Sequence, residues 1–191
     1  AAALAGDSGV QTDDFSAWTT RLGDFGHTVG LRAAIAVGSK ALPLWQAALD
    51  QDLRGPESWP RKTLEAIEVW LVSPSPKRER ESRDHAESWG KRLLMVVNKQ
   101  ANGEVTPRWP PPDPAVWGLG VAVSSAARAL CGQSIEDILL EVVTGSEWRA
   151  SPLSEASCRE SVSNELVPWA LGYRDPVRDR VEAGQRAGGR R

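Results

Sequence analysis

The chain has few of the residues that usually bind metals or carry catalysis. Among its 191 residues are two histidines, His27 and His85, and two cysteines, Cys131 and Cys158. The histidines lie far apart in sequence, and the cysteines have no accompanying pattern of metal ligands. Two cysteines are also too few for a disulfide scaffold, so reduced thiols are expected. We therefore expect no catalytic residues, no metal and no cofactor.

An excess of charge of one sign and long apolar segments are also missing. The formal net charge is −2 at pH 7, so no overall field attracts nucleic acid or acidic membranes. No apolar run is long enough to span a bilayer. The first six residues, AAALAG, lack the basic start of a signal peptide. The composition predicts a cytoplasmic protein that binds neither nucleic acid nor membrane.

Tryptophan, in contrast, is abundant. Nine Trp accompany two Phe and one Tyr. Trp buries a large ring and needs a partner for its N–H, which suits a core. It is also a favoured anchor at protein interfaces. The sequence therefore leaves two alternatives, a Trp-rich core and a Trp-lined binding surface.

Two amphipathic helices joined by a turn, within residues 31–70, organise the expected fold. Pro43 lies inside the first helix and predicts a kink, because it removes a backbone donor and crowds the preceding turn. The second helix begins at Pro60. The first apolar stripe consists of Leu31, Ile35, Leu42, Trp45 and Leu49. On the second helix, Leu64, Ile67, Trp70 and Leu71 are predicted to face inward, and Arg61, Glu65 and Glu68 outward.

The rest of the chain also has helical rather than strand-like periodicity. Further helices are predicted at 13–22, 77–96, 114–130, 134–144, 154–169 and 176–181, with a connector at 23–30. Their inward residues are expected to be Phe15, Trp18, Leu22, Ala86, Trp89, Leu93, Val96, Val116, Leu119, Val123, Ala126, Leu130, Ile135, Ile138, Leu139, Val142, Cys158, Val162, Leu166 and Trp169. The fold class is therefore all-α, a compact multi-helix bundle with proline-kinked helices.

One domain accounts for most of the length. Residues 1–12 are predicted to be a mobile N-terminus, 13–184 a single helical domain, and 185–191 a disordered basic tail. A subdomain boundary, if the domain is divided, falls in the proline-rich linker 102–112. The basic run at Lys77 does not predict nucleic-acid binding. Its charges are balanced by helical pairs, namely Lys77/Glu81, Glu79/Arg83 and Arg80/Asp84.

Two segments place a tryptophan beside prolines and are the predicted protein-binding surface. A stiff segment loses less entropy when a partner orders it. The candidate residues are Trp109, Pro110 and Pro111 in the linker, and Arg54 and Trp59 in the turn before the second helix. The alternative is that Trp109 and Trp59 plug the ends of the bundle.

The central helix pair resembles the Imm5-like group of bacterial immunity proteins. The resemblance rests on Ala41-Leu42-Pro43-Leu44-Trp45, then Pro60-Arg61, then Leu64-Glu65-Ala66-Ile67-Glu68-Val69-Trp70. Residues 37–40, VGSK, depart from the Ala-Asp-Cys type of segment expected before the proline. The resemblance implies a non-enzymatic bacterial protein that binds and neutralises a co-encoded toxin. A helical adaptor or structural subunit of a larger bacterial assembly is the alternative.

Overall fold

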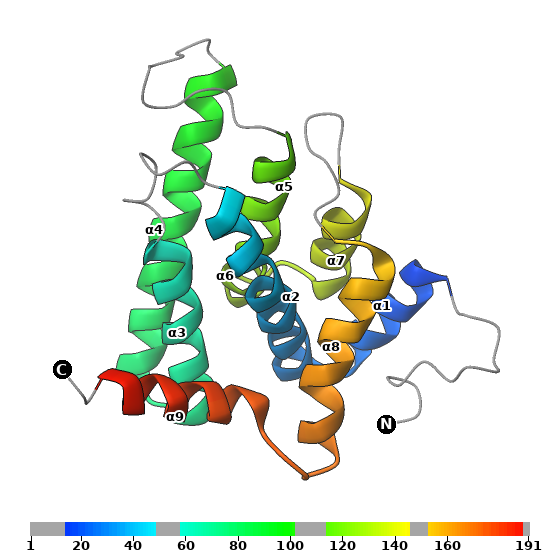
Figure 1. Cartoon of the computed structure of the whole chain (residues 1–191), viewed down its shortest axis with the longest axis vertical. Coiled ribbons are helices and arrows are strands. Elements are labelled where there is room, and N and C mark those ends of the chain that lie inside the picture. The colour runs from blue at the N-terminus through cyan, green and yellow to red at the C-terminus, as the bar shows by residue number, and fades with distance from the viewer. Residues whose placement is uncertain (1–13, 49–57, 102–113, 146–152, 189–191) are drawn as a thin grey trace.

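The computed structural model describes residues 14–48, 58–101, 114–145 and 153–188. Within these ranges the chain is helical and contains no strand, which confirms the all-α prediction there. No helix in these ranges is long and apolar enough to cross a membrane. The helices are α1 (Phe15–Asp24), α2 (His27–Ala48), α3 (Ser58–Val72), α4 (Pro76–Ala101), α5 (Pro114–Val123), α6 (Ser125–Leu130), α7 (Ile135–Thr144), α8 (Glu155–Ala170) and α9 (Pro176–Gly188) (Figure 1).

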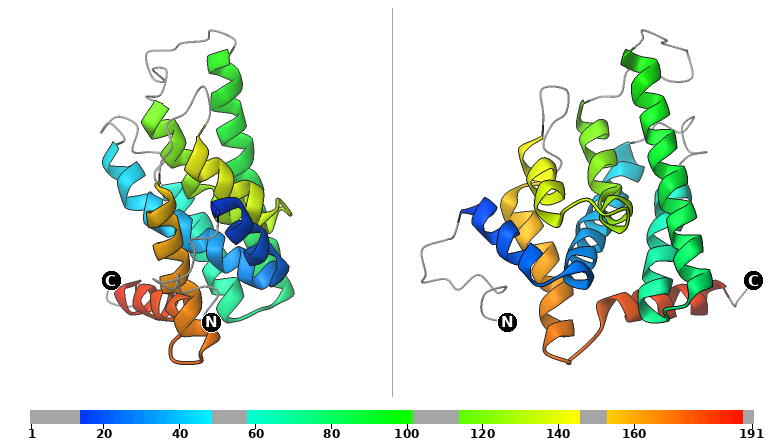
Figure 2. Two further views of the ribbon diagram at one scale, coloured as in Figure 1. Left: turned by 90° about the vertical axis from the view of Figure 1, so that its right-hand side faces the viewer. Right: turned by 180° about the vertical axis from the view of Figure 1, so that it is seen from behind.

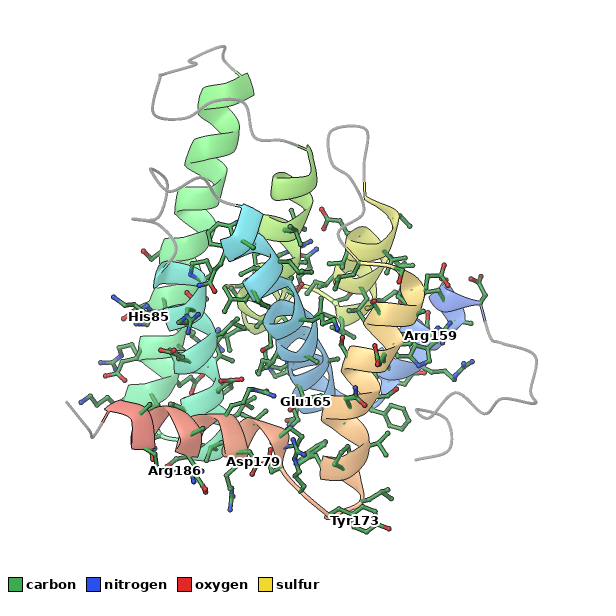
Figure 3. The ribbon with its side chains drawn as sticks, in the orientation of Figure 1. His85, Arg159, Glu165, Tyr173, Asp179 and Arg186 are labelled. Carbon is green, nitrogen blue, oxygen red and sulfur yellow. The ribbon has the colours of Figure 1, made fainter. Side chains whose placement is uncertain are left out.

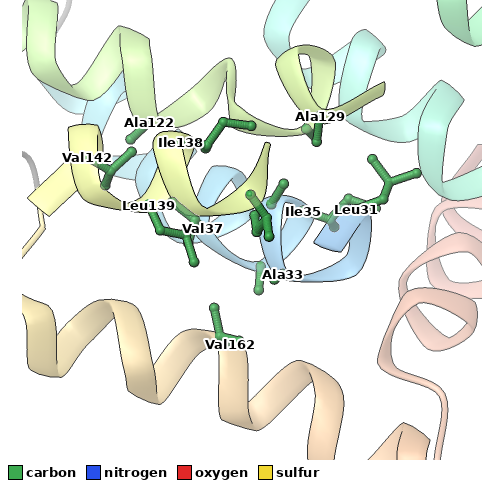
Figure 4. Close-up of a cluster of buried hydrophobic side chains, with 14 of the residues drawn as sticks. Leu31, Ala33, Ile35, Val37, Ala122, Ala129, Ile138, Leu139, Val142 and Val162 are labelled. Atoms are coloured by element: carbon green, nitrogen blue, oxygen red, sulfur yellow. The ribbon is translucent and has the colours of Figure 1, made fainter. Parts of the chain in front are cut away.

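Helix α2 is the centre of the bundle. It contacts α1, α3, α5, α6, α7 and α8, and these helices surround it in all three views (Figures 1 and 2). Every residue from Gly30 to Gly38 is buried. Successive residues of a helix point in different directions, so this part of α2 is enclosed on all sides. In Figure 4, Val162 of α8 and Ile138 of α7 approach it from opposite sides.

Two features of α2 follow from its sequence. The helix continues through Pro43 to Ala48, so Pro43 lies inside the first helix, as predicted, and does not end it. Gly38 lets two neighbouring helices come close, because a Cβ there would lie 3.2 Å from Leu64 Cδ2 and 3.3 Å from the Val123 carbonyl oxygen. A larger residue at this position would push α3 and α5 away from α2.

Helix α3 contacts α2, as predicted, but packs more extensively against α4. Ser82 of α4 is buried at this contact. Its hydroxyl lies 3.1 Å from the Ala66 carbonyl oxygen of α3 and 2.7 Å from the Arg78 carbonyl oxygen of its own helix. A small polar residue that satisfies itself in this way allows the two backbones to approach each other.

Most residues predicted to face inward are buried. The fully buried ones are Phe15, Trp18, Leu22, Leu31, Ile35, Trp45, Leu64, Ile67, Ala86, Val123, Ala126, Leu130, Ile135, Ile138, Leu139, Val142, Cys158, Val162 and Leu166. Leu42, Trp70, Leu71, Leu119 and Trp169 are half-buried against this core. Leu49 and the side chains of Trp89, Leu93, Val96 and Val116 lie outside the described part of the structure.

Several predicted boundaries are wrong. Helix α3 begins at Ser58 rather than at Pro60, and α4 extends beyond Val96 to Ala101. The connector 23–30 shrinks to Phe25 and Gly26, because α2 begins at His27 and Gly30 packs inside it against Ile135. The helix predicted over 114–130 is interrupted at Ser124. The Ser124 N–H donates to both the Gly120 and the Val121 carbonyl oxygens at 3.1 Å, and its hydroxyl donates to the Val121 carbonyl oxygen at 2.7 Å, so the backbone tightens toward i→i−3 bonding between α5 and α6.

The prediction for the C-terminal tail is also wrong. Helix α9 continues to Gly188, so residues 185–188 are helical rather than disordered. Arg186 Nε donates to the Glu182 carbonyl oxygen at 3.2 Å, and such a contact stabilises the end of a helix. Residues 1–13, 102–113 and 189–191 lie outside the described residues, so the predictions for the N-terminus and for the subdomain boundary stay predictions.

Candidate functional site

The structure does not test the surface predicted from tryptophan and proline. Trp109, Pro110, Pro111 and Arg54 lie outside the described residues. Trp59 lies in the first turn of α3, but its side chain is not described. The candidate site lies in another part of the chain.

Five charged side chains from widely separated segments meet where α9 joins the bundle. Helix α9 leaves the end of α8 and extends across the lower part of α3 (Figure 1), and it contacts both helices. The set, which we call the ion network, consists of Arg32 of α2, Glu68 of α3, Glu165 of α8, Asp175 just before α9, and Arg180 of α9.

Arg32 is the most connected member of the ion network. Its Nη1 and Nη2 donate to Asp175 Oδ1 and Oδ2 at 2.9 and 3.0 Å. Its Nη1 lies 3.6 Å from Glu165 Oε1, and its Cζ stacks 4.3 Å from the ring centroid of Trp169. Arg32 is only 4% exposed. One planar guanidinium therefore makes a two-bond carboxylate contact and a cation–π contact at once.

Arg180 forms the other half of the ion network. Its Nε donates to Glu68 Oε1 at 2.6 Å, and its Nη1 donates to Glu165 Oε2 at 2.8 Å. Glu165 and Glu68 are 3% and 6% exposed. Glu68 was predicted to face solvent, and this prediction is wrong because α9 covers that side of α3 and supplies the opposite charge.

The carboxyl groups of the ion network respond differently to burial. Burial raises the pKa of Glu68 above its ordinary value, and the charge and hydrogen bond of Arg180 only partly offset this. Burial also acts to raise the pKa of Asp175. There, however, the hydrogen bond and charge of Arg32, with the backbone N–H groups of Arg178 and Val177, outweigh burial and lower the pKa. Asp175 is therefore the firmly ionised partner of Arg32.

The turn between α8 and α9 is closed by backbone hydrogen bonds. Gly172 has φ +71°, a conformation that glycine adopts easily. The N–H of Gly172 donates to the Trp169 carbonyl oxygen at 3.0 Å, and that of Tyr173 to the Pro168 carbonyl oxygen at 3.0 Å. These two bonds define a Schellman motif. Asp175 Oδ1 then accepts from the Val177 N–H at 3.1 Å and caps α9.

Two apolar side chains project from this ordered turn. Tyr173 is 82% exposed and Leu171 is 44% exposed. Figure 3 shows Tyr173 at the tip of the turn, pointing away from the bundle. Arg174 Nε pairs with Asp179 Oδ2 at 2.8 Å beside it. We call residues 170–174 the exposed turn.

The groups usually sought in an active site lie elsewhere. His27 and His85 are exposed on different helices. Cys131 is an exposed free thiol, whereas burial raises the pKa of the Cys158 thiol to about 12. Among the described residues, no group of three or more His, Cys, Asp or Glu is placed to hold a metal ion.

On α4, two of the three predicted charged pairs form, Lys77–Glu81 at 3.8 Å and Arg83–Glu79 at 3.3 Å. The third, Arg80/Asp84, is not among the ion pairs of the described residues. The two pairs involve exposed side chains and so contribute little to stability. The predicted balance of charges within this helix is therefore met in part, and the absence of nucleic-acid binding stays a prediction.

Comparison with protein-family models, with curated proteins and with solved structures gives no match. The resemblance of the central helix pair to Imm5-like immunity proteins therefore stays a prediction. The exposed turn and the ion network are instead known from geometry alone. One sequence signal for the network exists, because Glu165 lies between Val162 and Leu166 on a predicted inward face. A carboxylate in that position needs a buried partner.

Proposed function

We propose that this protein acts by binding another protein and is not an enzyme. The observation that carries the proposal is Tyr173, the one tyrosine of the chain, which is 82% exposed on a turn closed by hydrogen bonds. Tyrosine is enriched among the residues that dominate binding energy at interfaces. Leu171 on the same turn extends the apolar contact surface.

The hydrogen bonds that close the exposed turn also support the proposal. A partner that binds an ordered aromatic side chain loses less conformational entropy than one that must order a loop. Tyr supplies a large contact area with only two side-chain torsions. The backbone bonds to Pro168 and Trp169 fix one end of the turn, and the helix cap at Asp175 fixes the other.

The proposed identity of the partner rests on the resemblance to Imm5-like immunity proteins. A co-encoded bacterial toxin, bound in the cytoplasm, is the partner that an Imm5-like protein would neutralise. Trp109, Pro110, Pro111, Arg54 and Trp59 are a second proposed contact surface for the same partner. Neither part of the proposal involves nucleic acid or a cofactor.

The experiment compares capture and stability in matched variants. Native partners are captured from the source cells with the parent chain and with Tyr173→Ala, and the partner is then purified and titrated. Tyr173→Ala should weaken binding by more than about 30-fold, as expected for an interface anchor, without changing the melting temperature. Phe25→Ala is the control, because Phe25 is also an exposed aromatic residue in an interhelical turn.

Equal affinity of Tyr173→Ala and the parent for the purified partner would rule out the exposed turn as the binding surface. Trp109→Ala and Trp59→Ala, measured in the same titration, would then decide whether the second surface binds. A reproducible turnover by the purified chain, lost in a His27, His85 or Cys158 variant, would contradict the non-enzymatic assignment.

A further inference from the structure

We infer that Arg32 is a positioning residue, which fastens both ends of the exposed turn to α2 and so presents Tyr173 and Leu171 in one orientation. The partner it suits is a protein with a preformed apolar pocket. The use of this orientation in binding rests on the proposed function. The fastening of the turn does not, and it can be measured without a partner.

Arg32 makes its contacts at the two ends of the exposed turn. Trp169 directly precedes the exposed turn, and Asp175 directly follows it. The Arg32 guanidinium stacks on Trp169, with Cζ 4.3 Å from the ring centroid, and makes two hydrogen bonds to Asp175. A single side chain therefore holds both ends of the five-residue turn, and the residues between are directed away from it.

Arg32 itself is held by a well-packed part of the bundle. Arg32 lies in the fully buried part of α2, between Leu31 and Ala33. Well-packed interiors transmit strain rather than absorb it. The turn is thus fixed relative to the centre of the bundle and not only to α8. Arg180, in contrast, holds α9 through Glu68 and Glu165 and binds no residue of the turn.

The contacts of Arg32 with Trp169 and Asp175 need a guanidinium group. An arginine can stack on an aromatic ring and fork to a carboxylate in the same plane, whereas a lysine ammonium is a point charge. Arg32→Lys keeps the charge and most of the volume but loses the two-bond geometry. If the role of Arg32 is positioning, the conservative change should loosen the turn while the fold is retained.

The side chains of the exposed turn indicate the chemistry of the partner. The Arg174 guanidinium beside Tyr173 is already paired with Asp179 at 2.8 Å. Leu171 and the Tyr173 ring are therefore the principal groups that the turn offers, and an apolar pocket is their complement. A preformed pocket matches a turn that is itself preformed, because neither side then loses much conformational entropy on binding.

The test uses the fact that the chain has one tyrosine. Full-length chain is labelled with 3-fluorotyrosine for ¹⁹F NMR and with ¹⁵N for backbone relaxation. In the parent, the backbone amides of residues 171–174 should have order parameters of about 0.85. In Arg32→Lys these order parameters should fall below about 0.6, and the ¹⁹F resonance of Tyr173 should narrow. Asp175→Asn should lower the order parameters in the same way, because asparagine can still cap α9 but lacks the negative charge that pairs with Arg32.

Arg159→Lys is the matched control. Arg159 also stacks on aromatic rings, 4.8 Å from the Trp18 centroid and 5.3 Å from that of Phe15, but away from the exposed turn. It should leave the order of residues 171–174 unchanged. Unchanged order of the turn in Asp175→Asn would overturn the positioning role, even if Arg32→Lys failed to fold.

Binding to the purified partner separates the two proposals. Arg32→Lys should weaken binding by about tenfold, because the partner must then order a loosened turn. The weakening should be seen as a faster dissociation rate. A loosened turn with unchanged affinity would keep the positioning role and overturn its use in binding. If Tyr173→Ala binds like the parent, the proposed binding surface fails, and the NMR result alone decides the role of Arg32.

Discussion

Arg32 and Asp175 are 143 positions apart in the sequence and form a two-bond ion pair, with N–O distances of 2.9 and 3.0 Å. The pair joins the central helix α2 to the cap of the C-terminal helix α9. The pair therefore joins two distant parts of the chain, and most of the helices between them in sequence pack around α2. Several measurable consequences follow from this pair and from the core around it.

Arg32→Ala should destabilise the fold by about 3–5 kcal/mol, because the buried Glu165 then keeps only Arg180 as an opposite charge and Asp175 loses both of its hydrogen bonds to Arg32. The loss should be seen as a lower urea midpoint with an unchanged m-value. Lys77→Ala is the comparison. It breaks an exposed pair with Glu81 on α4 and should cost about 1 kcal/mol or less. Equal losses in the two variants would contradict the importance of the ion network.

Asp175 should make the fold sensitive to acid. Its pKa is lower in the folded chain than its ordinary value of 3.8, so its ionised form stabilises the fold above that pH. This stability is lost as the pH falls through the folded-state pKa. Urea midpoints measured across this acid range should therefore fall less in Asp175→Asn than in the parent. Identical pH profiles would show that Asp175 is not held by Arg32.

Glu68 should act in the opposite direction. Its pKa is raised in the folded chain from the ordinary value of 4.5, chiefly by burial. The fold therefore binds a proton more tightly than the unfolded chain, and stability falls as the pH rises from 4.5 through the folded-state pKa. In Glu68→Gln this decline should be absent. A decline of the same size in the variant would assign it to another group.

The two thiols should differ in reactivity. Cys131 is exposed, whereas Cys158 is buried with its pKa raised to about 12. The thiolate is the reactive form, so an aromatic disulfide reagent at neutral pH should modify one thiol in the native chain and both after unfolding. Cys131→Ser should abolish the native reaction. Rapid modification of Cys158 in that variant would show that α8 opens easily.

Trp45 and Trp70 should differ in their effect on stability. Both are predicted from the sequence to be core residues, but only Trp45 is fully buried, and Trp70 is half-buried against the core. Trp45→Ala should cost about 3–5 kcal/mol. Trp70→Ala should cost less, because less apolar area is lost from the core. The comparison is made by thermal and urea unfolding, and a larger loss for Trp70→Ala would contradict the burial seen here.

Local patterns account for much of the fold. A stripe of apolar residues every three to four positions specifies both the helix and its inward face, as for Ile138 and Val142 of α7. Caps are equally local, and the side chain of Ser134 caps α7 by accepting from the N–H of Asp137, three residues later. The signals that failed are those with two local solutions, such as Gly30, which occurs inside a packed helix instead of a connector.

The sequence by itself determined that the chain is helical and which apolar residues face inward, because helical periodicity depends only on neighbours along the chain. Only the tertiary structure decided which charged residues are buried and which apolar ones are exposed. Glu68 lies on the polar side of α3 and becomes buried because α9, more than 100 residues later, packs over it with Arg180. Tyr173 is exposed because the ends of its turn are held by α2 and α8, and no local pattern encodes a contact between segments so far apart.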